Sequence, residues 1–275
     1  MTLVSKNISV KSVNLFQDGT VIFLLHRGSQ RMHGEPQKKN NQITKSTTPM
    51  INNPTILFYI ILSACLLVMY IPYIGKYIRV LETMIHEGGH VLLAAIVGVK
   101  ISKINLFSDT SGETHIAGAG KFKTLLIALA GYPLSSACAY GSFWAIKHGY
   151  HTVFMWTLCG ITLFFLLFYI RNKYGIFWAI TFIAANVYLL FTKKTAIITV
   201  LAGVYADILF LSSLFSCLIL VYLAFKSSNK AGDASLIKKS VHIPAQITAL
   251  IFLSVCGWIA FLTVKHFFPL CVTLF

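Results

Sequence analysis

Seven long apolar segments set the main constraint on how this 275-residue chain can fold. A helix needs about 20 residues to cross the hydrocarbon core of a bilayer, and most of these segments approach that length. Only 11% of the residues are charged, against about 25% in soluble domains. We therefore expect an all-α polytopic membrane protein with about six or seven transmembrane helices. The predicted spans are Ile56–Tyr73, Glu82–Val99, Thr124–Ile146, Thr152–Ile170, Ile176–Phe191, Ala196–Phe225 and Ile243–Val264.

Two of these segments depart from a simple span. Glu82–Val99 is short and begins with charged residues. Ala196–Phe225 is too long for one untilted span. Gly203 and Asp207 are candidate positions for a break that would divide it into a re-entrant hairpin or two short helices.

The chain carries 23 Lys and Arg against 8 Asp and Glu, a formal net charge of +15. In a soluble protein this balance would indicate nucleic acid as a partner. Here the basic residues mostly flank apolar spans, a pattern typical of charge at a membrane surface. We therefore expect the lipid bilayer as a partner and no nucleic acid. The six cysteines are scattered and form no CxxC pair, so neither a disulfide framework nor a cysteine zinc site is indicated.

The strongest chemical signal is the HExxH motif His86–His90, which continues into an apolar run from Val91 to Val97. Histidines four residues apart on a helix project from one face and can hold one zinc ion. Glu87 lies beside them and can act as general base on the hydrolytic water. The alternative, two packing histidines with Glu87 as their partner, would bury three polar groups in lipid without a metal. The motif therefore predicts zinc-dependent hydrolysis within or at the edge of a membrane.

Three features close to the motif bear on local structure. Gly88 and Gly89 weaken a helix, so they indicate the close approach of another backbone or of a substrate. Lys100–Ile116 alternates around an Asp/Ser/Gly turn and predicts a β-hairpin. The next span begins with Ala130–Pro133, where a glycine and a proline indicate a break or a close contact.

The two histidines leave the metal site incomplete, because catalytic zinc usually has three protein ligands. The C-terminal half of the chain contains two acidic residues, Asp207 and Asp233. Asp207 lies in an apolar run, which favours a functional role in the membrane, although a structural hydrogen-bond partner is an alternative. Asp233 precedes Ala-Ser-Leu-Ile and can serve as a helix N-cap. From the residues alone, Asp207 is slightly favoured and the third ligand stays open.

The motifs, taken in order, resemble the site-2 protease type of intramembrane zinc metalloprotease. The resemblance is closer to its bacterial, mostly uncharacterised, metallopeptidase-like branch, and it covers roughly residues 55–265. The segments that carry it are His86–His90, Ser108–Thr114, Ala130–Tyr132, Arg171–Gly175, and Asp233-Ala234 with Pro244.

The resemblance implies a site and a setting. In that family a distant aspartate followed by glycine is the third zinc ligand, and by position this role falls to Asp233. Here the next residue is Ala234, and the Asn-Pro pattern that precedes the aspartate in better-known members is missing. The implied metal ligands are therefore His86, His90 and Asp233, with Zn2+ as cofactor and Glu87 as catalytic base. The implied substrates are transmembrane proteins, and the implied location is a bacterial cytoplasmic (inner) membrane.

Membrane depth conflicts with this ligand set. His86–His90 lies near the start of the second predicted span, and Asp233 follows the sixth, on the opposite membrane face. The conflict disappears if Ala196–Phe225 is re-entrant; otherwise Asp207 lies on the better side. Loops after the second, fourth and sixth spans carry ten Lys and Arg against six on the other face, which predicts that the first group is cytoplasmic. That places the motif towards the outer side, whereas the resemblance suggests a site nearer the cytoplasm, so orientation stays open.

The chain divides into two regions of different composition. Residues 1–50 are basic, and 34–42 has a composition typical of disorder. This region is expected to be either a cytoplasmic tail or an extension upstream of a true start at Met50. Residues 51–275 are expected to form one integral membrane domain of the metalloprotease type.

Three functions follow from these features. The leading hypothesis is an intramembrane zinc endopeptidase, whose hairpin pairs with an extended substrate by strand addition. The second is a non-proteolytic scaffold or regulatory protein that retains the metalloprotease fold. The third is a transporter, although the chain has no paired charged spans or clear inverted repeat.

Overall fold

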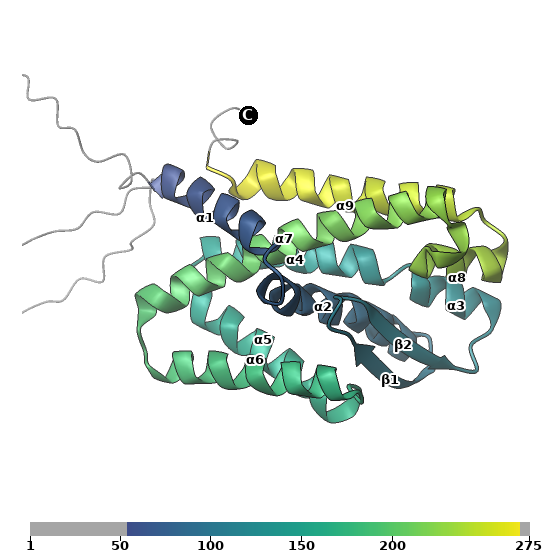
Figure 1. Cartoon of the computed structure of the whole chain (residues 1–275), viewed down its shortest axis with the longest axis horizontal. Coiled ribbons are helices and arrows are strands. Elements are labelled where there is room, and N and C mark those ends of the chain that lie inside the picture. The colour runs from purple at the N-terminus through teal and green to yellow at the C-terminus, as the bar shows by residue number, and fades with distance from the viewer. Residues whose placement is uncertain (1–53, 270–275) are drawn as a thin grey trace, which may run out of the picture. The chain divides into compact units, whose positions relative to one another are not determined.

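The computed structural model describes residues 54–269, so the basic extension predicted for residues 1–50 lies outside the described residues (Figure 1). The compact unit that begins at Phe58 contains most of the described residues. The elements in chain order are α1 (Pro54–Val68), α2 (Ile74–Ile96), β1 (Lys100–Leu106), β2 (Gly112–Ala117), α3 (Lys121–Ala128), α4 (Gly131–Lys147), α5 (His151–Phe168), α6 (Lys173–Phe191), α7 (Thr195–Lys226), a 3-10 turn at Ser228–Lys230, α8 (Gly232–Val241) and α9 (Ala245–Phe267).

Five helical segments are long and apolar enough to cross a membrane: α3 with α4, and α5, α6, α7 and α9. Many large apolar side chains on these helices face outward, including Tyr188 at 75% and Trp258 at 62% exposure. Such surfaces suit lipid rather than water. The predicted all-α polytopic membrane fold is confirmed. The first predicted span overlaps the 15-residue α1, and the second overlaps α2 and ends three residues beyond it, so neither belongs to the five.

Helix α2 begins at Ile74, eight residues before the predicted span, and extends for 23 residues. At 1.5 Å per residue, His86 therefore lies about 18 Å along the helix, past its middle. The sequence-based prediction placed the motif near the start of a span, on the face opposite to Asp233. With the true start of α2, the motif lies in the half of the helix that leads to the β-hairpin, and the predicted conflict of depth disappears.

Helix α7 is continuous over 32 residues. The predicted break at Gly203 or Asp207 is wrong, because Asp207 is buried by neighbouring helices and its polarity does not interrupt the helix. The helix is about 48 Å long, against a hydrocarbon core of about 30 Å. This excess length carries the chain beyond a span to the end of the bundle that holds the hairpin and α8 (Figure 1).

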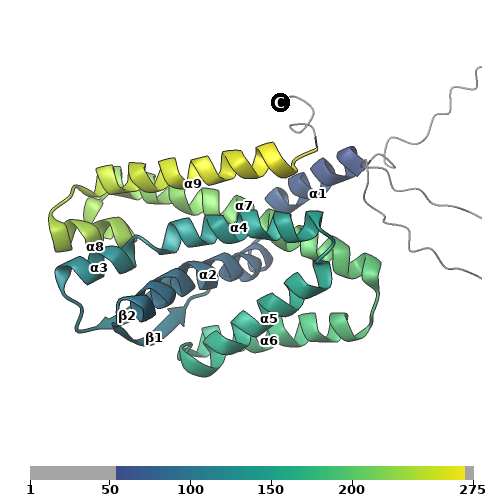
Figure 2. The same cartoon turned by 180° about the vertical axis from the view of Figure 1, so that it is seen from behind.

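The helices pack around α2. Helices α4, α7 and α9 contact one another, and α2 packs against α4 and α7 (Figures 1 and 2). Buried side chains of α2, including Leu81 and Met84, join the largest apolar core. Helices α5 and α6 form an antiparallel pair, and α3 packs against α8 near the hairpin. The middle of the motif helix is thus buried by protein, whereas Leu92 and Ile96 near its end are exposed.

Strands β1 and β2 form the predicted antiparallel hairpin, with Leu106 opposite Gly112. The second edge of β1 meets the turn between α5 and α6. Ile104 N–H donates to the Tyr169 carbonyl at 2.8 Å, and the Leu106 N–H donates to Asn172 Oδ1 at 3.0 Å. The Asn172 amide also donates to the Leu106 carbonyl. Asn172 therefore completes the hydrogen bonds of β1 as a further strand would.

Replacing Asn172 with Ala should lower the free energy of unfolding by about 2 kcal/mol, because it leaves a backbone N–H and C=O of Leu106 without partners. The measurement is the midpoint of thermal unfolding in detergent. The control is Asn229→Ala, at an exposed residue whose substitution should change stability by less than about 0.5 kcal/mol. Equal midpoints for the two variants would contradict this account of the hairpin edge.

Candidate metal centre

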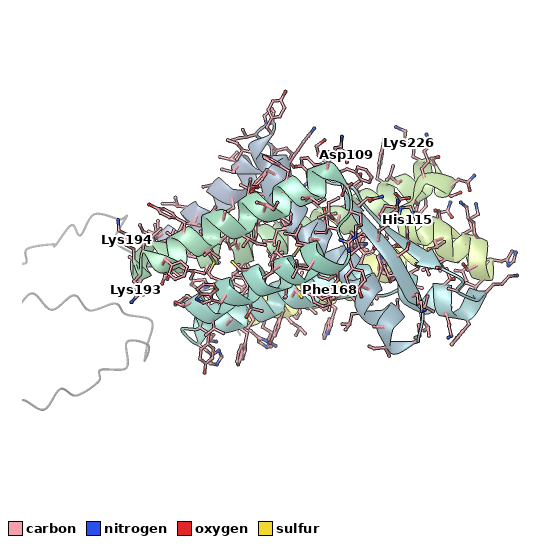
Figure 3. All side chains as sticks on the ribbon, turned by 90° about the horizontal axis from the view of Figure 1, so that it is seen from below. Asp109, His115, Phe168, Lys193, Lys194 and Lys226 are labelled. Atoms are coloured by element: carbon pink, nitrogen blue, oxygen red, sulfur yellow. The ribbon has the colours of Figure 1, made fainter. Side chains whose placement is uncertain are left out.

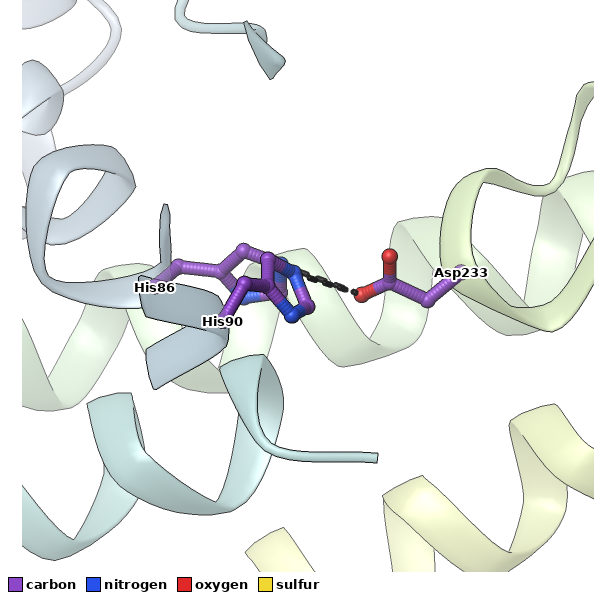
Figure 4. A group of neighbouring side chains, drawn as sticks. All are labelled: His86, His90 and Asp233. Carbon is purple, nitrogen blue, oxygen red and sulfur yellow. Dashed lines mark hydrogen bonds and ion pairs between the residues drawn. The ribbon is translucent and has the colours of Figure 1, made fainter. Parts of the chain in front are cut away.

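Two elements far apart in the chain bring three ligand-type side chains together. His86 and His90 project from one face of α2, and Asp233 projects from the first turn of α8. The two Nε2 atoms lie 3.2 Å apart, and Asp233 Oδ2 lies 3.2 Å from His86 Nε2 and 3.3 Å from His90 Nε2. Figure 4 shows the carboxylate pointing at the two imidazoles. In residues 54–269 this is the one group of three or more His, Cys, Asp or Glu side chains with that arrangement.

The triangle formed by these three atoms fits a zinc-sized ion. Ligands bound at about 2.0–2.1 Å in tetrahedral geometry are separated from one another by roughly 3.3–3.4 Å. The observed sides of 3.2–3.3 Å are close to that value. Two imidazole nitrogens and one carboxylate oxygen also form a donor set typical of catalytic zinc, which keeps its fourth position open.

Backbone groups hold both imidazoles. His90 Nδ1 lies 2.8 Å from the Ile127 carbonyl oxygen, so it donates there and leaves Nε2 with its lone pair towards Asp233. The His86 ring lies against the backbone of Gly131, where a Cβ would be 2.6 Å from Nε2. The Tyr132 ring packs edge-on against the His86 ring, with 4.5 Å between the ring centroids. The expected break near Ala130–Pro133 therefore exists between α3 and α4, and it positions both histidines.

The space beside each glycine of the motif is occupied by protein atoms. A Cβ at Gly89 would lie 2.9 Å from the Ala130 carbonyl oxygen, and one at Gly88 would lie 2.9 Å from Cζ of Phe165. The expectation that another backbone approaches is correct for Gly89. At Gly88 the neighbour is an aromatic side chain.

Asp233 lies inside the first turn of α8, whose N-cap is Ala231, so the N-cap interpretation is wrong. Burial by itself would raise the pKa of the Asp233 carboxyl, but the two adjacent imidazoles lower its pKa well below the usual range. The next residue, Ala234, which stands where the sequence resemblance implies a glycine, is fully buried in an apolar cluster that includes Ala128, Ala249 and Phe252.

The hairpin holds Glu87. The Thr114 hydroxyl on β2 donates to Glu87 Oε2, and Gly112 leaves room for the same carboxylate, since a Cβ there would be 2.8 Å from Cγ of Glu87. Thr83, one turn earlier on α2, donates to the Thr110 carbonyl at 2.9 Å. The Ser108–Thr114 motif, expected from sequence as part of the hairpin, therefore also orients the candidate base.

Asp207 is not part of this group. It is buried within α7 at 2% exposure, and the Cys65 thiol contacts its Oδ2 at 4.0 Å. This geometry matches the structural alternative that the sequence left open.

A cavity of about 390 Å³ adjoins the centre and is lined by residues of α2, the hairpin turn, α7 and α8. His86, Glu87 and Asp233 line it together with Glu82. In the sequence, Glu82 is recognisable only as the charged start of a predicted span. The roles of Gly112, Thr114 and the Ile127 carbonyl depend on contacts between distant segments and could not be predicted from the sequence.

A helical membrane fold whose HExxH helix meets a distant aspartate defines a class of membrane metallopeptidase-like proteins. The peptidase M50B-like family matches residues 59–263, well over half of the chain. The chain belongs to this family, which is of the site-2 protease type, and the resemblance drawn from the motifs is thereby confirmed. No curated protein and no solved structure matches the chain.

Replacing Gly131 with Ala should weaken zinc binding by about 10–100-fold, because the added methyl group would displace the His86 ring. Zinc bound per chain is measured by elemental analysis during competition with a chelator. Gly141→Ala is the matched control, since a Cβ at this position of the same helix meets nothing within 4 Å. Equal zinc affinity in the two variants would contradict the role assigned to Gly131.

Proposed function

We propose that this protein is an intramembrane zinc metalloendopeptidase that hydrolyses peptide bonds of membrane-embedded substrates. The observation that carries the proposal is the triangle of His86, His90 and Asp233, with Glu87 held beside it at a cavity. Zinc bound by these three residues would supply Lewis-acid activation of water and of the peptide carbonyl. Membership of the peptidase M50B-like family supports a membrane metalloprotease of this type.

Glu87 would take the proton from the attacking water and return it to the leaving amine. Its position favours this role, because the Thr114 hydrogen bond and the space at Gly112 hold the carboxylate next to the metal ligands. Burial at 5% exposure limits competing water. His90, fixed through the Ile127 carbonyl, would keep its Nε2 lone pair available to the metal.

The substrate backbone would pair with β2. The opposite edge of the hairpin is partly occupied. The backbone of Ile104 forms hydrogen bonds with the backbones of Tyr169 and Arg171, and the Asn172 side chain forms hydrogen bonds with the backbone of Leu106. Within residues 54–269 no strand pairs with the outer edge of β2. A peptide added there lies next to Thr114 and Glu87, close to the proposed metal. Transmembrane substrates would need local unwinding to present such an extended segment.

Charge favours a site that faces the cytoplasm. The group of ten Lys and Arg lies on β1, on α3, at the turn between α5 and α6 with the first residue of α6, and from the last residue of α7 through the 3-10 turn to α8. In Figure 3, Asp109, His115 and Lys226 lie at this end and Lys193 and Lys194 at the other. The positive-inside rule then assigns the metal end to the cytoplasmic side, of a bacterial inner membrane in this proposal. In this proposal, the later position of the motif along α2 removes the disagreement between the charge pattern and the family resemblance.

Replacing Asp233 with Ala should abolish stoichiometric zinc binding, whereas Asp207→Asn should leave about one zinc per chain, because only Asp233 approaches the histidines. Elemental analysis of purified protein distinguishes the two candidates. The assignment fails if the Asp207 variant loses the metal and the Asp233 variant retains it.

Replacing Glu87 with Gln should keep zinc and reduce cleavage by about a hundredfold to ten-thousandfold, as expected for loss of a general base. The assay follows quenched-fluorescent apolar peptides in detergent micelles. Glu113→Gln, at an exposed glutamate of β2, is the matched control and should retain activity. Full cellular function of the Glu87 variant would instead favour the scaffold alternative.

A further inference from the structure

Glu82 is a buried acidic residue at the proposed active site to which the hydrolytic mechanism assigns no role. It lies four residues before His86 on α2, so the two side chains share a face and line the same cavity. Its side chain is only 5% exposed. The rise of a helix over four residues puts it about 6 Å along α2 from the metal ligand.

The carboxylate of Glu82 is incompletely satisfied. Oε2 accepts a hydrogen bond from the Ser216 hydroxyl of α7 at 3.1 Å, whereas Oε1 is buried and has no hydrogen-bond partner in the described residues. Across residues 54–269, no Lys, Arg or His nitrogen lies within 4.0 Å of it. A buried carboxylate without a cation is costly, so a cation that enters the cavity would gain free energy by pairing with it.

None of the other charged groups around the cavity forms an observed ion pair or hydrogen bond with Glu82. Asp233 faces the two histidines, and Asp109 accepts hydrogen bonds from Ser111. The basic lining residues are Arg79, one turn earlier on α2, and the exposed Lys230. The buried Nε of Arg79 also has no hydrogen-bond partner, so an internal pair between Arg79 and Glu82 is the competing arrangement.

We propose that Glu82 and Ser216 form a subsite for a cationic side chain, Lys or Arg, of the peptide substrate beside the scissile bond. This inference rests on the proposed peptidase function, because it assigns a substrate class to the same site. The cavity of about 390 Å³ exceeds the roughly 30 Å³ of one water many times over, which leaves room for a side chain. The terminal torsion of a glutamate is broad, so its free oxygen can turn to meet an entering ammonium or guanidinium group.

The expected substrates also carry such groups where the site lies. Transmembrane segments are flanked by Lys and Arg at the cytoplasmic interface. Asp233 lies on α8, just beyond the end of α7 and before α9, so the centre includes a residue from the end of these two spans. A juxtamembrane cation of a substrate would therefore reach Glu82 when the neighbouring peptide bond reaches Glu87. The subsite would select the ends of transmembrane segments over their apolar middles.

The test measures binding without turnover. Full-length zinc-loaded Glu87→Gln protein in detergent is titrated with apolar peptides capped at both ends. The peptides differ at one scanned position, which holds lysine, norleucine or acetyl-lysine. We expect the lysine peptide to bind about tenfold more tightly than the other two at the best position, and Glu82→Gln added to this protein should reduce the ratio to about one. Ser216→Ala should reduce the ratio by a smaller factor.

Several outcomes would overturn the subsite. One is equal affinity for the lysine and norleucine peptides in the Glu87→Gln protein. Another is an unchanged ratio in a Glu82→Gln variant with full zinc content. In the matched control, Arg79→Gln should keep the ratio. A ratio of about one with Arg79 present that rises in Arg79→Gln would establish the internal Arg79–Glu82 pair instead. Absence of cleavage by the wild type would count against the peptidase proposal, and the binding ratio separates that failure from failure of the subsite.

Discussion

The close approach of the α3–α4 break to α2 is the contact on which the rest of the site depends. The Ala130 carbonyl packs against Gly89 of α2, and the His86 ring of α2 packs against Gly131. Each glycine therefore leaves space for an atom group of the other segment. The same approach brings the Ile127 carbonyl to His90. A longer side chain at either glycine would separate α2 from α3, and α3 is the element against which α8 packs. The position of Asp233 therefore depends on a contact that Asp233 does not make.

Much of this arrangement could be predicted from sequence. His86, Glu87 and His90 follow from helical spacing, and the alternation after Lys100 gave the hairpin. The start of α2 could not be found from hydropathy, because Lys76, Arg79 and Glu82 interrupt the apolar pattern although the helix continues through them. In α7, Gly203 and Asp207 suggested a break, but packing against neighbouring helices overrides local propensity. Both errors affected depth, which is why the partner of the histidines stayed open.

The motifs that marked the family have separate physical roles. In Ser108–Thr114, Gly112 and Thr114 serve the Glu87 carboxylate. In Arg171–Gly175, Asn172 completes the edge of β1, and Gly175 leaves space for that amide. One motif thus orients the candidate base, and the other holds the hairpin that carries it. Neither role is visible in a single segment, since each involves residues more than 25 positions apart.

The placement of Asp233 on a short helix after α7 has a consequence for how the protein is made. His90 and Asp233 are separated by 143 positions, and five helices are synthesised between α2 and α8. A growing chain therefore exposes two of the three ligands to the membrane long before the third exists. The candidate metal centre can form only when nearly the whole bundle has been synthesised. The order of these residues along the chain thus ties formation of the candidate centre to a late stage of synthesis.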